Sequence, residues 1–386
     1  MESVEKKWYQ NVEWTSAIFL LVTPVLALIL GIYYLYNFGF SWALLALMTF
    51  YYFATGMSIT AGYHRLFSHR TYEASLPVRL FYLFFGAAAF QNSVITWCTD
   101  HRYHHKYTDS DNDPYNAKRG FWFSHIGWML TKESPVDDRV GNLITRDLQK
   151  DPWVKFQHDF YIPIAAFSSF GVPTLIGWSF GEPLGAFIFA GLVRMALVHH
   201  YTFFINSLAH IWGRQTYGKA NTAKDNAFIS LFTYGEGYHN FHHHFQNDYR
   251  NGIRWYDYDP TKWLICSASF VGLAGKLKRT PEQEIILARV SQQTSEALSD
   301  QKSGWEPYAP RLEQLRERID QCASQLKELQ DDYNQLKKRL ATKKDLRLAV
   351  LKRDIKVAKR ELRLRYYHWR STLSQLEKFG PQALPS

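Results

Sequence analysis

The chain has 386 residues, of which 46% are hydrophobic, 17% aromatic and 21% charged, and this balance excludes a disordered or collagen-like protein. The formal net charge is +10, and residues 311–370 hold most of the excess, with 18 Lys or Arg against 9 Asp or Glu. The three cysteines, Cys98, Cys266 and Cys322, are far apart and odd in number, which argues against a disulfide framework and a cysteine-ligated metal site.

Long uncharged segments dominate the first half of the chain. Residues 14–63 contain no Asp, Glu, Lys or Arg, and residues 161–205 contain one Glu and one Arg. Because a helix needs about 20 residues to cross the hydrocarbon of a bilayer, we expect crossings near residues 17–36 and 41–60 and two more within residues 161–205. The first run is longer than the apolar core of a signal peptide, and no small-residue cleavage site follows it, so we interpret it as a spanning helix.

Two pairs of crossings return the chain to its starting side, so we expect both termini and the loop of residues 64–160 on that side. Among the basic residues of this loop are Arg65, Arg70, Arg102, Lys106, Lys118 and Arg119. By the positive-inside rule this side is the cytoplasm. Residues 80–99 are also uncharged, but Gln91 and Asn92 interrupt them. We expect this segment to lie in the interface or against other helices, because a crossing would separate the histidine motifs on either side of it.

Nine of the 15 histidines occur in short motifs. Two motifs have the spacing i, i+3, i+4, which places three imidazoles on one face of a helix. The motif residues are His64 and His69; His101, His104 and His105; Asn206 and His210; and His239, His242 and His243. Packed together without a metal, nine neutral imidazoles would leave polar nitrogens unsatisfied, and nine cations would repel one another. We therefore predict a metal centre on the cytoplasmic side.

The number of ligands suits two metal ions, because four ligands are enough for one zinc ion. No cysteine lies in the motifs, which disfavours copper(I)-thiolate and iron–sulfur sites, but imidazole binds iron, zinc, copper and nickel. The residues alone therefore do not select one of these metals. We interpret the histidines outside the motifs as interfacial side chains: His125, His158, His199, His200, His244 and His368.

In order, spacing and intervening residues, the motifs resemble those of the membrane fatty acyl desaturases, especially their Δ9 acyl-CoA branch. The matching segments are His64-Arg-Leu-Phe-Ser-His69, His101-Arg-Tyr-His104-His105-Lys106, Asn206-Ser-Leu-Ala-His210 and Gly235-Glu-Gly-Tyr-His239-Asn-Phe-His242-His243, with Phe90-Gln91-Asn92 and Arg119-Gly-Phe-Trp-Phe-Ser-His125-Ile-Gly-Trp128 between them. The resemblance covers roughly residues 15–280. It implies an all-α integral membrane protein with four transmembrane helices under a cytosolic helical cap.

The resemblance also implies a diiron centre whose nine histidine ligands are the catalytic residues, with a water held by Asn206. The division that it implies gives one iron His64, His105, His210, His242 and the Asn206 water, and the other iron His69, His101, His104, His239 and His243. It further implies that the substrate headgroup or upper chain contacts Gln91, Asn92 and Trp128.

The implied activity is an O₂-dependent desaturation that introduces a cis double bond, at Δ9, into a saturated acyl-CoA. Family members that use acyl-CoA often have Arg before the Asp of the second motif and Arg-Lys after Trp128, where this chain has Thr99 and Thr131-Lys132. An acyl-lipid desaturase and a diiron hydroxylase of fatty acyl or alkyl chains are therefore alternatives. A metal transport or storage protein is the remote alternative, because transport predicts acidic residues within the crossings and the first two contain no charged residue.

Desaturation needs external electrons. The chain contains no His-Pro-Gly-Gly segment, no GxGxxG and no CxxC, so we expect no bound haem, flavin or nicotinamide. We expect instead a separate donor of the ferredoxin, rubredoxin or cytochrome b5 type, for which the basic cytosolic face suits an acidic surface. No nucleic-acid partner is expected.

A different pattern begins after the part of the chain that resembles the family. We expect a transmembrane domain over residues 1–280, a linker over residues 281–310 and a basic helical tail over residues 311–378. Apolar side chains between residues 312 and 340 alternate at steps of three and four, which is typical of a coiled-coil seam, and a second block spans residues 351–376. The phase slips between the blocks without Pro or Gly, which fits a stutter or a helical hairpin. We favour a basic helical hairpin or an oligomerisation stalk that touches anionic lipid; a solvated charged helix without a partner is the alternative.

Overall fold

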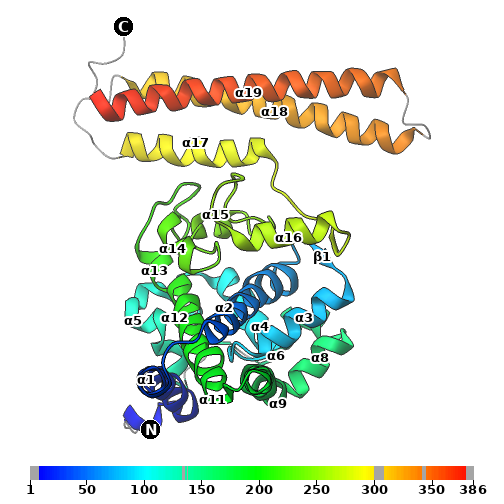
Figure 1. Cartoon of the computed structure of the whole chain (residues 1–386). Coiled ribbons are helices and arrows are strands. Elements are labelled where there is room, and N and C mark those ends of the chain that lie inside the picture. The colour runs from blue at the N-terminus through cyan, green and yellow to red at the C-terminus, as the bar shows by residue number, and fades with distance from the viewer. Residues whose placement is uncertain (1–7, 133–134, 137, 300–307, 341–344, 380–386) are drawn as a thin grey trace. The chain divides into compact units, whose positions relative to one another are not determined.

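The computed structural model shows a predominantly helical chain that divides into two compact units (Figure 1). The structure describes residues 8–132, 135–136, 138–299, 308–340 and 345–379. The membrane unit comprises residues 1–215 and 221–279, and the tail unit comprises residues 216–220 and 280–386. In the described residues the only sheet is an antiparallel pair, β1 (Glu73–Ala74) and β2 (Ala274–Gly275).

Four segments of the membrane unit are long and apolar enough to cross a bilayer. They are Trp14–Phe38, Trp42–Ser68, Tyr161–Ser179 and Pro183–Ile211. Their outward side chains are apolar, as a lipid environment requires; Leu28, for example, is 64% exposed. The predicted all-α multi-pass membrane fold with four crossings is thus confirmed.

The first span is a single α-helix, whereas each of the other three contains a π-helical segment. The elements are α1 (Trp14–Phe38); α2 (Trp42–Met57) with η2 (Ser58–Ser68); α9 (Tyr161–Ala166), η5 (Phe167–Gly171) and α10 (Val172–Ser179); and α11 (Pro183–Ala186), η6 (Phe187–Val193), α12 (Arg194–Asn206) and α13 (Leu208–Ile211). π-Helical turns are frequent at functional sites, and η2 includes the first histidine motif residue, His64.

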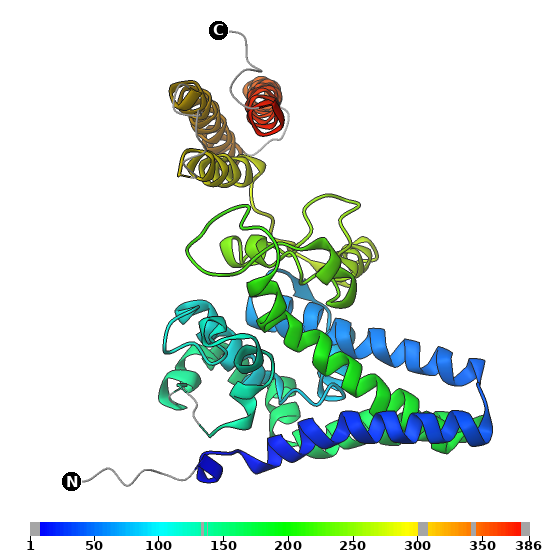
Figure 2. The same cartoon turned by 90° about the vertical axis from the view of Figure 1, so that its left-hand side faces the viewer.

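The turns between paired spans are linked to each other. Figure 2 shows α1 and α2 meeting at a tight turn, which Gly39 permits with a φ of +80°. The other turn contains Glu182, whose carboxylate accepts hydrogen bonds from the Tyr34 hydroxyl at 3.2 Å and the Ser41 hydroxyl at 2.8 Å. The single acidic residue of the second pair of spans therefore joins the two helical hairpins at their far end.

Residues 80–99 do not form a fifth span. They are divided between α3 (Leu76–Ala87), which is too short to cross, and α4 (Val94–Tyr107). Between these helices Phe90 and Asn92 have positive φ angles of 54° and 70°. The expectation that this segment packs against other helices is confirmed, because α3 contacts η2 and α2.

Short helices complete the cap of the membrane unit. They are η1 (Trp8–Gln10), η3 (Ala117–Arg119), α5 (Phe121–His125), η4 (Gly127–Leu130), α6 (Asp138–Ile144), α7 (Arg146–Gln149), α8 (Pro152–Asp159), α14 (Ala227–Phe232), α15 (His239–His244) and α16 (Pro260–Phe270). Helices of this unit begin at side-chain caps. The Ser93 hydroxyl accepts a hydrogen bond from Thr96 N at the start of α4, and the Asp151 carboxylate accepts one from Trp153 N at the start of α8.

The tail unit is a three-helix bundle of α17 (Glu282–Ser299), α18 (Ala309–Arg339) and α19 (Leu346–Phe379). Helices α18 and α19 run antiparallel in Figure 1, as the helical-hairpin alternative predicts, and their link at residues 341–344 lies outside the described residues. The predicted seam forms the core of this bundle, where Leu312, Ile319 and Leu362 are at most 1% exposed.

The expectation of a linker over residues 281–310 is wrong for its first part. Helix α17 occupies it and buries Ile286 and Val290 against the seam. The apolar residues of α17 recur at helical spacing. The linker was nevertheless predicted because Thr280-Pro281 before this helix and the Gly and Pro residues after it are typical of a linker. Residues 300–307 lie outside the described part of the chain.

Replacing Trp369 with Ala should destabilise the bundle strongly. The Trp369 side chain is fully buried and donates a hydrogen bond to Thr294 of α17 at 3.1 Å, and Trp→Ala in a core costs roughly 3–5 kcal/mol. Hydrogen–deuterium exchange of α17 to α19 in the full chain should become at least a hundredfold faster. Gln325→Ala, at an exposed position of α18, should leave exchange nearly unchanged. Equal exchange rates in both variants would contradict the position of Trp369 in the bundle core.

Candidate metal centre and substrate cavity

All nine predicted histidines meet in the membrane unit, in two groups. The five-His group contains His64, His69, His101, His105 and His242, and the four-His group contains His104, His210, His239 and His243. In each group one nitrogen from every ring lies within 4.8 Å of the others. The rings come from η2 and the residue after it, from α4, from α13 and from α15, so four distant parts of the chain build the centre.

The Nε2 atoms of each group approach closely. In the five-His group the separations are 2.8 Å for His69 and His101, 3.0 Å for His64 and His242, and 3.0 Å for His242 and His105. In the four-His group they are 3.3 Å for His104 and His243, 3.1 Å for His239 and His210, and 3.1 Å for His243 and His239. Nitrogens bound at about 2 Å to one metal ion lie about 3 Å apart, so these spacings suit shared ions.

Polar partners on the Nδ1 atoms determine which nitrogen holds the lone pair. His64 Nδ1 lies 3.0 Å from Glu236, and His104 Nδ1 lies 2.8 Å from Asp113. His210 Nδ1 lies 2.8 Å from the hydroxyl of Thr222, which itself donates to Asp109. A proton on Nδ1 leaves a lone pair on Nε2. Facing lone pairs repel each other unless a cation lies between them, and the arrangement therefore fits a metal at each group.

The protein environment favours the neutral form of six of these imidazoles. Burial, followed by repulsion between neighbouring rings, lowers the pKa well below its usual value for His69, His101, His105, His239, His242 and His243. A neutral imidazole is the form that donates to a metal. Both groups can therefore hold metal ions.

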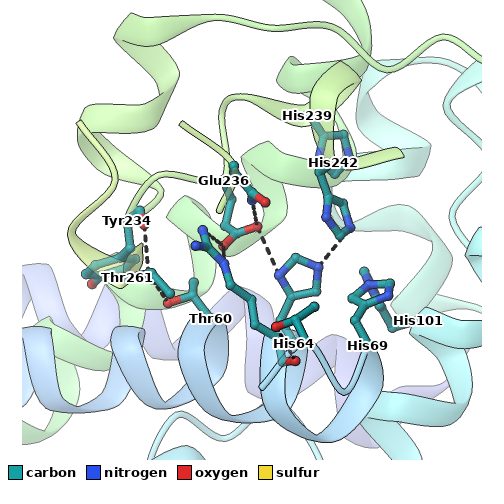
Figure 3. Close-up of polar contacts among 12 residues, drawn as sticks. Thr60, His64, His69, His101, Tyr234, Glu236, His239, His242 and Thr261 are labelled. Atoms are coloured by element: carbon teal, nitrogen blue, oxygen red, sulfur yellow. Dashed lines mark hydrogen bonds and ion pairs between the residues drawn. The ribbon is translucent and has the colours of Figure 1, made fainter. Parts of the chain in front are cut away.

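A buried ion network supports the five-His group (Figure 3). Glu236 accepts from Arg65 at 2.8 Å, and Arg65 also donates to Asp259 at 3.1 Å; the exposure of each side chain is at most 1%. Burial raises the pKa of the Glu236 carboxyl, but attraction to His64 and Arg65 outweighs burial and lowers this pKa to about 2. In Figure 3 the His64 ring lies between Glu236 and His242, so the network fixes the orientation of a candidate ligand.

The backbone before Glu236 explains a glycine of the third motif. Gly235 has a φ of +98°, and a Cβ there would lie 2.6 Å from a carboxylate oxygen of Asp259. Only glycine allows this close approach without strain. The Gly235-Glu236 pair therefore serves to bring the carboxylate between Arg65 and His64.

A cavity of about 460 Å³ lies beside the histidines. Its lining includes the predicted substrate residues Gln91, Asn92 and Trp128, as well as His101 and Asn206. The rest of the lining is largely aromatic and aliphatic: Phe19, Leu20, Phe90, Trp97, Tyr115, Met129, Tyr161, Ile162 and Phe203. The Gln91 side chain donates to Thr202 at 3.0 Å, so it is held by α12 rather than free in the cavity.

The expected division of the histidines is wrong. His210 joins the four-His group, and His69 and His101 join the five-His group with His64. Asn206 lies at the end of α12, four residues before His210 of the four-His group. The outer partners Glu236, Asp113, Asp109 and Thr222 were missed, although the carboxylates lie near the motifs in the sequence.

Two of the remaining histidines are not interfacial. His125 is 4% exposed and contacts Ser207 and His200 at 3.0 and 3.1 Å. His199 is 3% exposed and its Nε2 donates to the Ala89 carbonyl at 2.7 Å. These residues pack inside the protein and lie outside both histidine groups.

Comparisons with known proteins agree with this site. The model of the fatty acid desaturase family matches residues 40–266. A probable acyl-CoA desaturase of Schizosaccharomyces pombe is 44% identical over 74% of this chain and 59% of its own length. Acyl-CoA desaturase 1 of Saccharomyces cerevisiae is 42% identical over 74% of this chain and 56% of its own length.

A human relative is matched over a larger share of its length. This stearoyl-CoA desaturase is 42% identical over 62% of this chain and 68% of its own length. The chain thus spans somewhat more than half the length of the two fungal relatives. The matched region contains η2, the residue after it, α4, α13 and α15, which together provide all nine clustered histidines. The chain belongs to the fatty acid desaturase family.

Proposed function

We propose that the chain is an acyl-CoA desaturase that uses two irons and O₂ to introduce a cis double bond, at Δ9, into a saturated acyl chain. The observation that carries this proposal is the position of the two histidine groups beside an apolar cavity. His101 belongs to the five-His group and also lines that cavity. The proposal is supported by the names of the relatives, which are acyl-CoA and stearoyl-CoA desaturases.

The residues of the chain perform binding, orientation and exclusion of water. When bound, a pair of irons with O₂ supplies the oxidising power that removes two hydrogens from neighbouring saturated carbons, which no side chain can do. The aromatic walls bury the acyl chain and hold one pair of carbons in a fixed place. Asn206 lies where it can hold a water beside the four-His group, and Trp128 Nε1 is buried without a hydrogen-bond partner, ready to donate to a substrate oxygen.

The charged headgroup is proposed to bind near Thr131, where the cavity lining approaches the loop of basic residues. Of the basic residues expected there, Arg102 is already engaged: it donates to Asp147 at 2.6 Å and to the Phe67 carbonyl at 2.7 Å. Lys106, Lys118, Arg119 and Lys132 are exposed and can meet the phosphates of CoA. These four basic residues, without Arg102, are sufficient for a few charge-assisted hydrogen bonds to the phosphates.

The proposed topology places both termini and the histidine groups in the cytoplasm. It is supported by the meeting of His64 with His101 and His242, since residues on opposite sides of a bilayer could not meet. It is also supported by the basic residues of the loop. Electrons are proposed to come from a separate acidic protein that docks on this basic face.

Lipid analysis of cells that express the full chain tests the proposal. We expect a new cis-monounsaturated acid that appears first in the acyl-CoA pool, because the substrate is the thioester. His101→Ala should abolish the product, whereas His244→Ala, outside both groups, should retain it. A hydroxylated product would indicate a hydroxylase, and a product that appears first in complex lipids would indicate an acyl-lipid desaturase.

A further inference from the structure

Helix α19 of the tail unit has two apolar faces. One face is the bundle core, where Leu348, Leu362 and Leu376 are 4%, 1% and 1% exposed. The second face is turned away from α17 and α18, and its members follow at alternating steps of four and three residues. They are Leu346, Val350, Arg353, Val357, Arg360, Leu364 and Tyr367, which we call the outer seam.

The outer seam is exposed although most of it is apolar. Leu346, Val350, Val357, Leu364 and Tyr367 are 80%, 41%, 60%, 59% and 61% exposed. At 100° per residue these positions lie opposite the buried seam. Neither α17 nor α18 can therefore cover them, and a row of exposed apolar side chains on a charged helix indicates an interaction surface.

Positive charge is concentrated on this helix. Helix α19 has ten Lys or Arg and three Asp or Glu, whereas α18 has seven and six, and α17 has one and three. Several basic side chains of this helix, one of them in the outer seam, have no carboxylate partner among the described residues: Lys356, Lys359, Arg360 and Arg370. The charge and the exposed apolar residues thus occur on one helix of the three.

A second copy of the chain does not suit the outer seam. Pairing two copies of α19 would place Arg353 and Arg360 in the contact, next to further Lys and Arg, and like charges in such a contact repel. An anionic bilayer surface suits it better. Lys and Arg can extend their charged ends to lipid headgroups while Val, Leu and Tyr enter the interface.

The tail leaves the membrane unit near a segment that follows a membrane span. The membrane unit ends at Arg279 and α17 begins at Glu282. Just before this exit, the Lys278 amide donates to the Thr71 carbonyl at 2.8 Å, and Thr71 follows the span Trp42–Ser68 by three residues. The bundle is therefore joined to the chain close to the end of a membrane span.

From the exposed outer seam and the basic residues beside it, we propose that α19 binds the surface of an anionic bilayer. The apolar side chains of the outer seam enter the interface, and Lys356, Lys359, Arg360 and Arg370 contact the lipid headgroups. This surface would add a second, salt-sensitive membrane attachment to a protein that already has four spans.

The test places an environment-sensitive fluorophore on the outer seam of the full chain. Cys266 and Cys322 are changed to Ser, Val357 is changed to Cys and labelled, and the protein is reconstituted in nanodiscs of neutral lipid or of neutral lipid with phosphatidylserine. Lipids brominated on their acyl chains quench a probe that enters the interface. We expect strong quenching with phosphatidylserine, little in neutral lipid, and a loss of quenching as salt is raised.

Two controls isolate the surface and its charge. A probe at Gln325→Cys, an exposed position on α18, should be unquenched in both lipids. Lys356→Gln, Lys359→Gln and Arg360→Gln together should lower the bound-to-free ratio of α19 roughly a hundredfold. Loss of the same charge from α18, by Lys327→Gln, Lys337→Gln and Lys338→Gln, should have a small effect.

Three results would overturn the proposal. Absence of quenching at position 357 in anionic nanodiscs would leave the outer seam without a lipid contact. Equal quenching in both lipids would remove the role of charge. Protection of the probe in detergent that increases with protein concentration would show a second copy of the chain as the occupant.

Discussion

His239→Ala should lower the metal content of the purified protein from two ions per chain to about one and should abolish desaturation. His239 belongs to the four-His group, where its Nε2 lies 3.1 Å from those of His210 and His243. Its loss leaves three imidazoles in that group, and stable structural sites use four ligands. The five-His group keeps all of its ligands, so one ion should stay bound. Elemental analysis of detergent-purified protein measures the change.

A double variant distinguishes the grouping in the structure from the division that the family motifs imply. His210 and His239 lie in one group in the structure, so His210→Ala with His239→Ala should still cost only one ion. If these two histidines served different ions, the double variant would lose both. His244→Ala, which removes a neighbouring imidazole outside the groups, is the matched control and should retain both ions. A double variant without bound metal would refute the grouping.

The crossings and the ligands were predictable because their signals are local. An uncharged run of 50 residues at positions 14–63 has few alternatives to a pair of spans. Imidazoles at i, i+3 and i+4 share a helix face in any context. Both signals depend on residues that are close in the sequence, and the structure places them as expected.

The pairing of the histidines was not predictable for the opposite reason. Adjacent residues of one motif separate: His104 joins the four-His group and His105 the five-His group. The packing of η2, α13 and α15 around α4 decides which histidine group each side of α4 contacts. This packing depends on the whole membrane unit and not on the motif alone. The role of Arg102 was missed similarly, because its partners Asp147 and Phe67 are 45 and 35 residues away.

Glu236→Gln should weaken metal binding while the membrane unit stays folded. The carboxylate of Glu236 contacts Nδ1 of His64 at 3.0 Å and is not itself a member of either histidine group. Loss of such an outer carboxylate typically lowers metal affinity by 10–100-fold. The amide oxygen of Gln still accepts a hydrogen bond from His64, but it lacks the charge that favours a proton on Nδ1. Competition with a chelator, read as the concentration that removes half of the metal, measures this change.

The same substitution should also reduce stability, because it removes one of two carboxylates that face the buried Arg65. Breaking a buried ion pair by removing one partner costs roughly 3–5 kcal/mol, and the remaining contacts of Arg65 to Asp259 and to the Tyr249 carbonyl should keep the loss near the lower end. Asp151→Asn is the matched control: it removes a carboxylate that pairs with Arg79 and caps α8. It should lower stability and leave the chelator curve unchanged. If Glu236→Gln gives the same chelator curve as the native chain, then Glu236 stabilises the unit through Arg65 alone and does not orient His64 for the metal.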